Sequence, residues 1–434
     1  MRFPCGVPVH GRAISRSAAA AALLVAGMLV AGAGPAAATS ARPAAATSAR
    51  PTAVAGCPGQ AAPPGPPARE ETVAVAPLPV PDPPVSGLAT CRDAHAGTAP
   101  PPQVGAASYV VADLDSGEVL AARAPHARER PASTIKLLLA LLVAERLPAN
   151  EVVTVVQADV DVDGSRAGIG PGGRYTVAQL LQGLLLASGN DCANALARRL
   201  GGAPTTVAAM RDEAVRLGAL DTRPATPSGL DGPGMSVSAH DLAVIYRAAI
   251  AEPRIATVLR TRNVPFPGFG AHPGFVLGND DKLLGTPGFL GGKNGFTDAA
   301  RHTFVGGMQR GGRRLVVSLV RGETHPVRMV DQAKALLGWG FGVRAGGIGT
   351  LPAAEPEQDA GPDASAAPGG VPGSGAPGVG PGADSPTATE AGGPDADAGP
   401  SGSSTAVVAA GGGAVLAAAA IIGVLEVRRR QRRR

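Results

Sequence analysis

Two long stretches rich in Ala, Pro and Gly confine the folded part of this chain to its middle. Residues 39–104 and 346–404 contain few large apolar side chains, so they cannot bury enough surface to offset the conformational entropy that folding costs. Residues 105–345 instead mix aliphatic runs, charges and turn residues, and a segment of this length can form one sizeable core. We therefore predict one domain between a Pro/Ala-rich N-terminal arm and a disordered, extended Pro/Gly/Ala-rich linker.

The first 38 residues have the pattern of a secretory signal peptide. Arg2, Arg12 and Arg16 precede an apolar run, and Ala36-Ala37-Ala38 offers small residues for cleavage. This order of a basic, an apolar and a small-residue segment is typical of export signals. An uncleaved membrane anchor is the alternative interpretation.

Residues 405–427 predict a transmembrane helix, and residues 428–434 a basic tail on its cytoplasmic side. The chain carries no charge from Ala406 to Leu425, and about twenty residues at helical rise just cross a hydrocarbon core. The arginine cluster that follows should stay in the cytoplasm. A low-complexity tail is the alternative. Together the two ends predict a single-pass protein of the cell membrane whose domain lies outside the cytoplasm.

The basic character of the chain belongs to its termini. The first 38 residues hold three arginines and the last seven hold six, whereas the formal net charge of the whole chain is only +5. The segment between these two ends is therefore net acidic. Because no basic stripe remains in the middle, nothing there indicates a nucleic-acid partner.

Three cysteines remain after the predicted signal peptide. Cys57 and Cys91 flank a Pro-rich stretch, and a disulfide between them is permitted outside the cytoplasm. In the chain-entropy model it would stabilise the folded state by about 3–4 kcal/mol. Cys192 lies in an apolar helical segment, where we expect a buried thiol.

The order of elements in the middle predicts an α/β (α+β) fold, with an antiparallel sheet flanked by helices and a helical subdomain. Residues 108–113 and 118–122 read as a hairpin, as do residues 301–308 and 314–321. Helices are expected between these hairpins, at residues 137–147, 175–187, 191–200, 203–217 and 239–251, and again at 331–339. Strands at both ends with helices inserted between them indicate a mixed antiparallel architecture.

The pair Ser133-x-x-Lys136 is the strongest candidate for chemistry. Residues three apart share one face of a helix, so the lysine amine would lie beside the serine hydroxyl. Pro131 marks the helix start, where the Ser133 backbone N–H is free to stabilise an oxyanion. Burial against the leucines that follow would favour the neutral amine, which can accept a proton.

Lysine is rare in this chain, which makes its position informative. Only Lys136, Lys282, Lys293 and Lys334 occur among many arginines, and arginine cannot act as a base because it is not deprotonated in proteins. Other hydrolase patterns are missing, since no serine lies in G-x-S-x-G and no Cys/His spacing indicates zinc. We expect no metal and no cofactor.

Two further motifs follow in order. Ser188-Gly189-Asn190 lies between two predicted helices, and Lys293-Asn294-Gly295-Phe296-Thr297 follows a Gly-rich turn. S-x-x-K, S-D-N and K-T-G are the signature set of penicillin-binding proteins and class A β-lactamases. Residues of about 105–341 resemble the serine D-Ala-D-Ala carboxypeptidases, the low-molecular-weight penicillin-binding proteins. The stretches YTVAQLLQGLLLASGNDCANALA, SGLDGPGMSVSAHDLA and GGKNGFTDAARHTF carry the resemblance.

The resemblance implies a DD-peptidase/β-lactamase-like fold and a role for each motif residue. Ser133 would attack the carbonyl between two terminal D-alanines and form an acyl-enzyme. Lys136 would take its proton, and Ser188 would help to pass it to the leaving amine. The backbone N–H groups of Ser133 and Phe296 would form the oxyanion hole. The implied substrate-binding residues are Asn190, Lys293, Asn294, Gly295, Phe296, Thr297 and Arg328.

The same resemblance implies the ligands. Peptidoglycan stem pentapeptides would be the substrate on the cell-wall side of the membrane, with loss of the terminal D-Ala, and β-lactams would be inhibitors that trap the serine. Two positions depart from the usual pattern: Asn294 replaces a Thr, and Thr226 stands where similar sequences often carry Asn. His240 and His302 are expected to be structural.

Two alternatives remain open at this point. A class A-like β-lactamase shares the triplets but needs a glutamate for deacylation, and only Glu213 and Glu252 lie between the second and third motifs. Neither is followed by the usual Leu-Asn pattern. The other alternative is a catalytically weak cell-wall-binding protein that keeps the fold.

Overall fold

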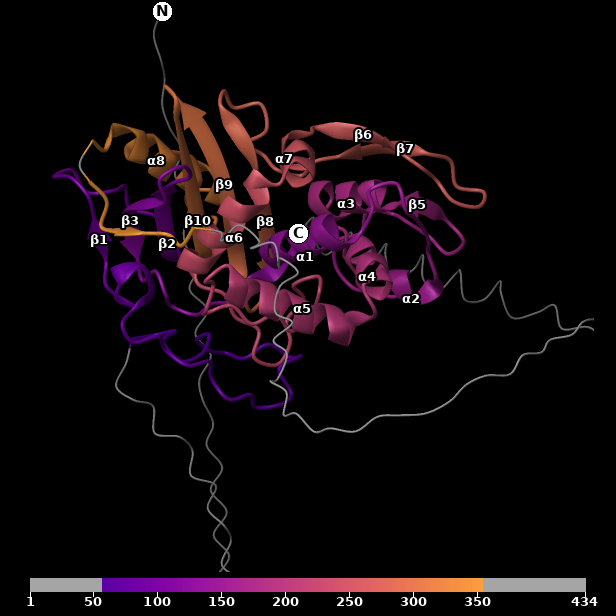
Figure 1. Cartoon of the computed structure of the whole chain (residues 1–434), viewed down its shortest axis with the longest axis horizontal. Helices are drawn as coiled ribbons and strands as arrows, with labels where there is room; N and C mark the ends of the chain where they lie inside the picture. Colours follow the sequence, from indigo (N-terminus) through magenta and orange to yellow (C-terminus); the bar gives the residue numbers. More distant parts are fainter. Residues whose placement is uncertain (1–56, 345, 354–434) are drawn as a thin grey trace, which may run out of the picture. The chain divides into compact units, whose positions relative to one another are not determined.

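An antiparallel sheet forms the centre of the fold, and its strands come from both ends of the folded segment (Figure 1). The computed structural model describes residues 57–344 and 346–353, all of which belong to one compact unit. Strands in the order β1-β3-β2-β10-β9-β8 make up the sheet, with β11 also paired to β3. Their bounds are β1 Ala94–His95, β2 Ala106–Asp113, β3 Glu118–Arg123, β8 Phe289–Thr297, β9 Arg301–Arg310, β10 Arg313–Gly322 and β11 Gly349–Thr350.

Both predicted hairpins are confirmed. Between β2 and β3, the Asp113 carboxylate accepts the backbone N–H groups of Asp115 and Ser116 at 3.0 and 3.1 Å, a turn that Asp forms readily. Between β9 and β10, Gly311 and Gly312 have φ angles of 57° and 83°, which glycine adopts without strain.

The helices between β3 and β8 form the predicted helical subdomain. The bounds of the longer helices are α1 Lys136–Arg146, α3 Val177–Leu186, α4 Asn190–Arg199, α5 Ala203–Arg216, α6 Ala239–Ala251, α7 Pro253–Arg260 and, after β10, α8 Met329–Gly342. Shorter elements are η1 Val85–Gly87, η2 Ala132–Ile135, α2 Gln157–Val160, β4 Val152–Thr154, β5 Arg174–Thr176, β6 Asn263–Phe266 and β7 Phe275–Gly278. Ser238 caps α6 by accepting the N–H of Asp241, as its sequence predicts.

Helices cover the sheet on both faces. Helix α8 packs against β2, β9 and β10, and α6 packs against the same three strands. Alternating residues of these strands belong to two separate apolar clusters: Val110 and Val316 join that of α1, α3 and α6, whereas Val111 and Val317 join that of α8. This alternation is what a sheet buried on both faces requires.

The described part of the Pro/Ala-rich N-terminal arm is folded onto the domain, although its composition predicts little burial. Residues 57–95, here called the N-terminal strap, pack on the domain, and β1 pairs with β3. Arg128 is 1% exposed and donates to the carbonyls of Ala61, Leu78 and Pro79. A Pro-rich segment has carbonyls but few N–H donors, and a guanidinium with five N–H groups satisfies several of them.

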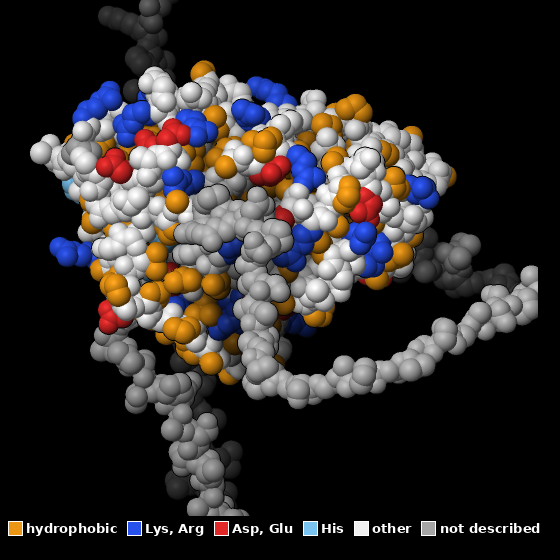
Figure 2. Space-filling view, viewed as in Figure 1, with side chains coloured by type: hydrophobic (Ala, Val, Ile, Leu, Met, Phe, Trp, Pro, Cys, Tyr) orange, Lys and Arg blue, Asp and Glu red, His pale blue; other side chains and the backbone are white. Residues whose placement is uncertain are grey.

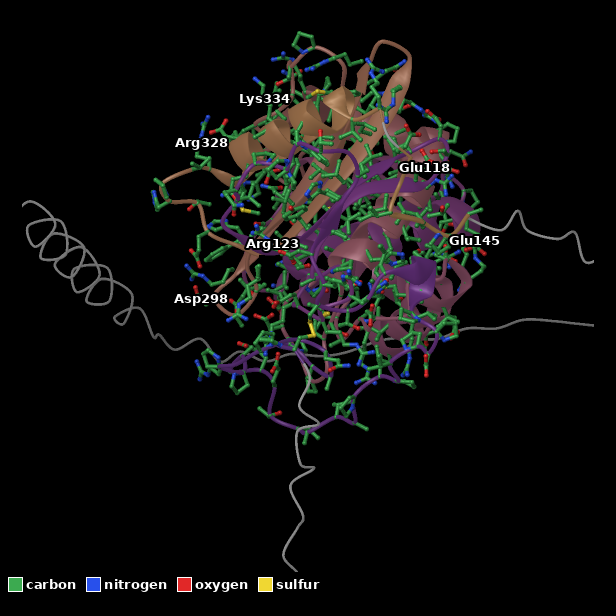
Figure 3. The ribbon with its side chains drawn as sticks, turned by 90° about the vertical axis from the view of Figure 1, so that its left-hand side faces the viewer. Glu118, Arg123, Glu145, Asp298, Arg328 and Lys334 are labelled. Carbon is green, nitrogen blue, oxygen red and sulfur yellow. A yellow bond between two sulfur atoms is a disulfide. The ribbon has the colours of Figure 1, made fainter. Side chains whose placement is uncertain are left out.

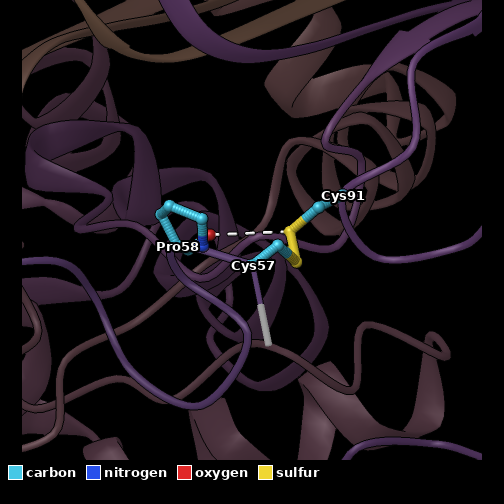
Figure 4. Close-up of a disulfide and its surroundings, with 3 residues drawn as sticks. All are labelled: Cys57, Pro58 and Cys91. Atoms are coloured by element: carbon cyan, nitrogen blue, oxygen red, sulfur yellow. Dashed lines mark hydrogen bonds between the residues drawn. A yellow bond between two sulfur atoms is a disulfide. The ribbon is translucent and has the colours of Figure 1, made fainter. Parts of the chain in front are cut away.

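The two cysteines that the sequence analysis paired are joined in the structure. A disulfide links Cys57 to Cys91 across a Cα–Cα distance of 5.9 Å (Figure 4). This disulfide joins two residues near opposite ends of the strap and so closes the strap into a loop. Cys192 is a buried free thiol, as expected.

The folded segment also extends beyond residue 345, so the predicted start of the linker is too early. Strand β11 pairs with β3, and Leu351 is 1% exposed. The predicted signal peptide, most of the linker, the transmembrane helix and the basic tail lie outside the described residues. Within the described residues, no helix has both the length and the apolar character needed to cross a bilayer.

Charges of both signs are mixed on one face of the domain. Figure 2 shows Lys and Arg side chains interspersed with Asp and Glu on this face.

Candidate active site

Ser133 lies in the short turn η2, which leads directly into α1. The hydroxyl of Thr303 on β9 donates to the Pro131 carbonyl at 2.9 Å and so ties the start of this turn to the sheet. Strand β8 passes so close to Ser133 that a Cβ added at Gly295 would lie 2.8 Å from the Ser133 backbone nitrogen. Glycine is therefore needed for β8 to approach the serine.

Lys136 is the first residue of α1, and its side chain is fully buried. Its Nζ lies 2.8 Å from Ser133 Oγ and donates to Asn190 Oδ1 at 2.7 Å and to the Ser228 carbonyl. Burial, and then the charge of Lys293, hold the pKa of the amine well below its ordinary 10.5. When the amine is deprotonated, its two N–H groups can be donated to the amide and the carbonyl, which leaves its lone pair for the serine hydroxyl.

Helix α4 brings the second motif to the same place. Ser188 has a φ of 57°, a left-handed conformation that turns the chain from α3 into α4. Asn190 is the first residue of α4, and its Nδ2 donates to the Asp163 carbonyl at 2.7 Å. Its side chain thus bridges Lys136 to the loop of residues 163–169, which the sequence analysis did not assign to the site.

Asp191 is a further residue that sequence reasoning missed. Its carboxylate is fully buried and accepts the backbone N–H groups of Ala167, Gly168 and Ile169 at 2.9 to 3.3 Å. These bonds fix the loop against the N-terminus of α4, where a negative charge is favourable. An acidic residue in the first turn after Ser188-Gly189-Asn190 was the available signal.

Thr226 and Ser228 complete the surroundings of the lysine. Thr226 Oγ1 donates to the Leu230 carbonyl at 2.8 Å and accepts the Gly229 N–H at 3.1 Å. This turn holds the Ser228 carbonyl that accepts from Lys136. The Thr at position 226 therefore serves the turn, although similar sequences often carry Asn there. A backbone acceptor such as the Ser228 carbonyl leaves no signal in the sequence.

Lys293 lies on β8 and is 1% exposed. Its Nζ donates to the carbonyl of Asn294 at 2.9 Å and to Asn294 Oδ1 at 3.1 Å. Burial lowers the pKa of the amine, and the negative charges of Asp280 and Asp281 oppose this effect. Burial in turn raises the pKa of Asp281 to about 6. The two aspartates were not predicted from the sequence.

A cleft of about 670 Å³ runs along the edge strand β8. Most of the predicted site residues line it: Ser133, Ser188, Asn190, Asn294, Gly295, Phe296, Thr297 and Arg328. Lys136 and Lys293 are buried beneath this lining and reach it through Ser133, Asn190 and Asn294. Because β8 is an edge strand, its outer N–H and C=O groups face the cleft, where an extended peptide can pair with them.

Arg328 sits at the rim of the cleft, at the start of α8. Figure 3 shows it projecting outward from the edge of the molecule. Its side chain is 71% exposed and pairs with Asp331 at 2.7 Å. The structure therefore places Arg328 beside the cleft, with its guanidinium engaged by a neighbouring carboxylate.

His302, expected to be structural, also lines the cleft. Its ring lies 4.6 Å from the ring of Phe296, which is 49% exposed. The two residues form an aromatic wall on β8 and β9. Glu213 and Glu252, the two glutamates considered for a β-lactamase, lie elsewhere: Glu213 pairs with Arg216 and Glu252 caps α7, and neither lines the cleft.

A buried histidine pair lies under the strap. Ligand atoms of His126, His240 and Asp241 fall within 4.8 Å of one another, a spacing that a metal ion could span. Each ring nitrogen already has a partner, however: His126 bonds to Asp221 and the Val85 carbonyl, and His240 to Asp241 and Ser86. This group is thus occupied as a hydrogen-bonded anchor for η1.

A serine and a buried, pKa-lowered lysine beside an edge strand define a serine-type peptidase. Comparison with known proteins supports this class. The family described as D-alanyl-D-alanine carboxypeptidase matches residues 95–324. Among characterised relatives, the D-alanyl-D-alanine carboxypeptidase DacB2 of Mycobacterium tuberculosis is 48% identical over 251 residues, which is 57% of this chain and 86% of that protein. DacD of Salmonella typhimurium is 33% identical over 267 residues, covering 58% and 67% of the two chains.

Solved structures agree with the sequence comparison. The crystal structure of a D-alanyl-D-alanine carboxypeptidase from Mycobacterium tuberculosis H37Rv is similar with a TM-score of 0.58 and 45% identity, covering 60% of this chain and 100% of that one. The Streptomyces K15 DD-transpeptidase has a TM-score of 0.54 and 25% identity, covering 56% and 100%. This chain belongs to the D-alanyl-D-alanine carboxypeptidase family, and it is a serine-type DD-carboxypeptidase, a hydrolase.

Proposed function

We propose that the chain removes the terminal D-Ala of peptidoglycan stem pentapeptides through an acyl-enzyme on Ser133. The observation that carries this proposal is the 2.8 Å contact between Lys136 Nζ and Ser133 Oγ, with the pKa of the amine lowered by burial. A lysine that is neutral near neutral pH can act as the general base that a serine nucleophile needs.

The reaction has two steps. Ser133 Oγ forms a bond to the carbonyl carbon while its proton passes to Lys136 Nζ. The C–N bond then breaks, and Ser188 relays the proton from Lys136 to the leaving amine of D-Ala. In the second step water attacks the ester carbonyl and gives a proton to Lys136; the bond to Ser133 Oγ breaks, Lys136 returns the proton to this oxygen, and the shortened peptide leaves. The N–H groups of Ser133 and Phe296 stabilise the oxyanion in both steps.

Substrate binding is proposed to use the edge strand β8. An extended peptide pairs with the outer side of residues 294–297, and Asn190 holds a substrate amide. Lys293 and the Asn294 side chain bind the terminal carboxylate: Asn294 Oδ1 accepts from Lys293, which leaves the amide N–H₂ to donate to substrate. Arg328 reaches the same carboxylate once it leaves Asp331, and this exchange costs little because the pair is exposed.

We also propose that the domain works on the cell-wall side of the cell membrane. The export pattern of residues 1–38 and the apolar stretch before the arginine tail support this location. Fractionation tests it: the full chain is expected with membranes, and a chain ending at residue 404 is expected in the extracytoplasmic soluble fraction. Equal distribution of the two proteins would refute the anchor.

Labelling with a fluorescent penicillin tests the function. We expect covalent label on the wild type, none on Ser133→Ala, and release of D-Ala from a pentapeptide by the wild type alone. Slow loss of the label over time is expected of a carboxypeptidase, whereas rapid loss would favour the β-lactamase alternative. A folded wild type that neither binds label nor releases D-Ala would favour the wall-binding alternative.

A further inference from the structure

The N-terminal strap is docked on the residues that directly precede Ser133. Arg128 and Arg130 are 1% and 3% exposed, and both donate to strap groups. These two arginines lie on the chain segment that enters η2. The strap therefore contacts the approach to the nucleophile and not a remote part of the domain.

One contact of the strap is a largely buried ion pair. Both oxygens of Glu71 accept from Arg130, Oε1 from Nε and Oε2 from Nη2 at 2.8 Å, and Nη1 donates to the Pro64 carbonyl at 3.1 Å. The two side chains are only 15% and 3% exposed. A two-pronged, buried pair of this kind is among the strong polar contacts, and loss of one partner leaves an uncompensated charge.

Residues 130–134 are held from two sides. Glu71 binds Arg130 from the strap, while Thr303 on β9 donates to the Pro131 carbonyl at 2.9 Å. Directly after these anchors Ala132 has a φ of 48°, a strained conformation for a residue with a side chain. Such strain persists only where neighbouring structure enforces it. The strap is one of the elements that hold the residues before Ala132.

The positive charge of Arg130 also acts on Asp231, where it opposes the rise in pKa that burial causes. Asp231 directly follows Gly229 and Leu230, which line the cleft. Asp231 follows the turn whose Ser228 carbonyl accepts from Lys136. A shift of Arg130 would therefore change the surroundings of Asp231 as well as the approach to Ser133.

From these contacts we infer that Glu71 is a positioning residue for acylation, acting through Arg130 to hold Ser133 in place. The inference rests on the proposed role of Ser133. Glu71 does not line the cleft, so it acts without touching substrate. The strap is accordingly part of the working active site, although its sequence is Pro-rich and has no motif.

The test uses the full chain and the variant Glu71→Gln, which removes the charge but keeps the size. Acylation by a fluorescent penicillin at several concentrations separates the maximal rate from the half-saturating concentration. We expect the maximal rate to fall by about 10- to 100-fold, the size of effect that a small misplacement produces, with the half-saturating concentration unchanged. Glu71→Asp keeps the charge and should recover part of the rate.

The matched control is Asp93→Asn, which removes a strap carboxylate paired with Arg123 on β3, toward the other edge of the sheet. It should acylate at the wild-type rate. A wild-type maximal rate for a folded Glu71→Gln protein, or equal losses in the two variants, would overturn the inference. If Glu71→Gln does not fold, the maximal acylation rate of Arg130→Lys is measured instead. Lysine loses the two-pronged geometry, so a wild-type maximal rate in this variant would equally overturn the inference. Label retained by Ser133→Ala would refute the proposed function instead.

Discussion

The buried amine of Lys136 and the hydroxyl of Ser133 at the cleft are 2.8 Å apart, and the other two partners of the amine are also uncharged. No carboxylate takes part in these bonds. A cation would be poorly compensated there, so the protein environment favours the neutral amine. Base catalysis by Lys136 depends on this 2.8 Å contact.

Lys136→Arg tests the need for a neutral base. Arginine stays positively charged because it cannot release its proton, so acylation is expected to slow by about 10²- to 10⁴-fold, the usual contribution of general base catalysis. Lys334→Arg on the exposed side of α8 is the control (Figure 3). Stopped-flow acylation measures both, and wild-type rates in Lys136→Arg would argue against the lysine as base.

The pH dependence of acylation should report the pKa of Lys136. The reactive form is neutral, so the rate rises with pH through this lowered pKa and is level above it. Lys293→Gln removes a positive charge that lowers the Lys136 pKa, and the rising limb should therefore move to higher pH. Rate profiles of wild type and variant, with Lys334→Gln as control, check the direction. A limb that stays in place or moves to lower pH is incompatible with this electrostatic coupling.

Gly295→Ala tests the close approach of β8 to the nucleophile. The added Cβ would lie 2.8 Å from the Ser133 nitrogen and 3.0 Å from the Ala132 Cβ, so the strand or the turn must shift. We expect the maximal acylation rate to fall by about 10- to 100-fold. Gly278→Ala on β7 meets nothing within 4 Å and serves as control. Equal rates for both variants would mean that the spacing is not critical.

Glu129 should make stability depend on pH. Burial raises its pKa from 4.5 to about 7 against the opposing charges of Arg321 and Arg130. Between these two values the unfolded carboxyl is ionised while the folded one is protonated, so the free energy of unfolding falls as pH rises through this window.

The variant Glu129→Gln removes this ionisation. Relative to wild type, its free energy of unfolding should increase from pH 4.5 to 7, by on the order of 1–3 kcal/mol. Urea unfolding at several pH values measures the difference. A difference that is constant across the window would show that Glu129 does not titrate as its burial implies.

Much of the site could be predicted because its chemistry depends on side chains at short spacing. Ser133 and Lys136 are three residues apart, and a helical turn suffices to bring them together. The three motifs then gather in one cleft because helices α1 and α4 and strand β8 meet at the sheet edge. The antiparallel sheet and its two hairpins followed from turn residues and alternation.

The strap and the Ser228 carbonyl could not be predicted for different physical reasons. The strap is rich in Pro and Ala and has few large apolar residues, among them Leu78 and Leu88. It is held largely by buried arginines far along the chain, such as Arg128, that satisfy its carbonyls. Composition alone therefore indicated disorder. The Ser228 carbonyl belongs to the backbone, whose position depends on the turn around Thr226 and not on residue type. The resemblance implied that Arg328 belongs to the substrate site, and the structure places it at the rim of the cleft. Its ion pair with Asp331 could not be predicted from the sequence.

The most direct test of the account is to locate the covalent adduct of a β-lactam by mass spectrometry of the intact protein and its peptides. We predict a mass increase equal to one β-lactam, carried by the peptide that contains Ser133, and no increase in Ser133→Ala. An adduct on another residue, or an unchanged mass for the folded wild-type protein, would contradict the assignment of Ser133 as the nucleophile.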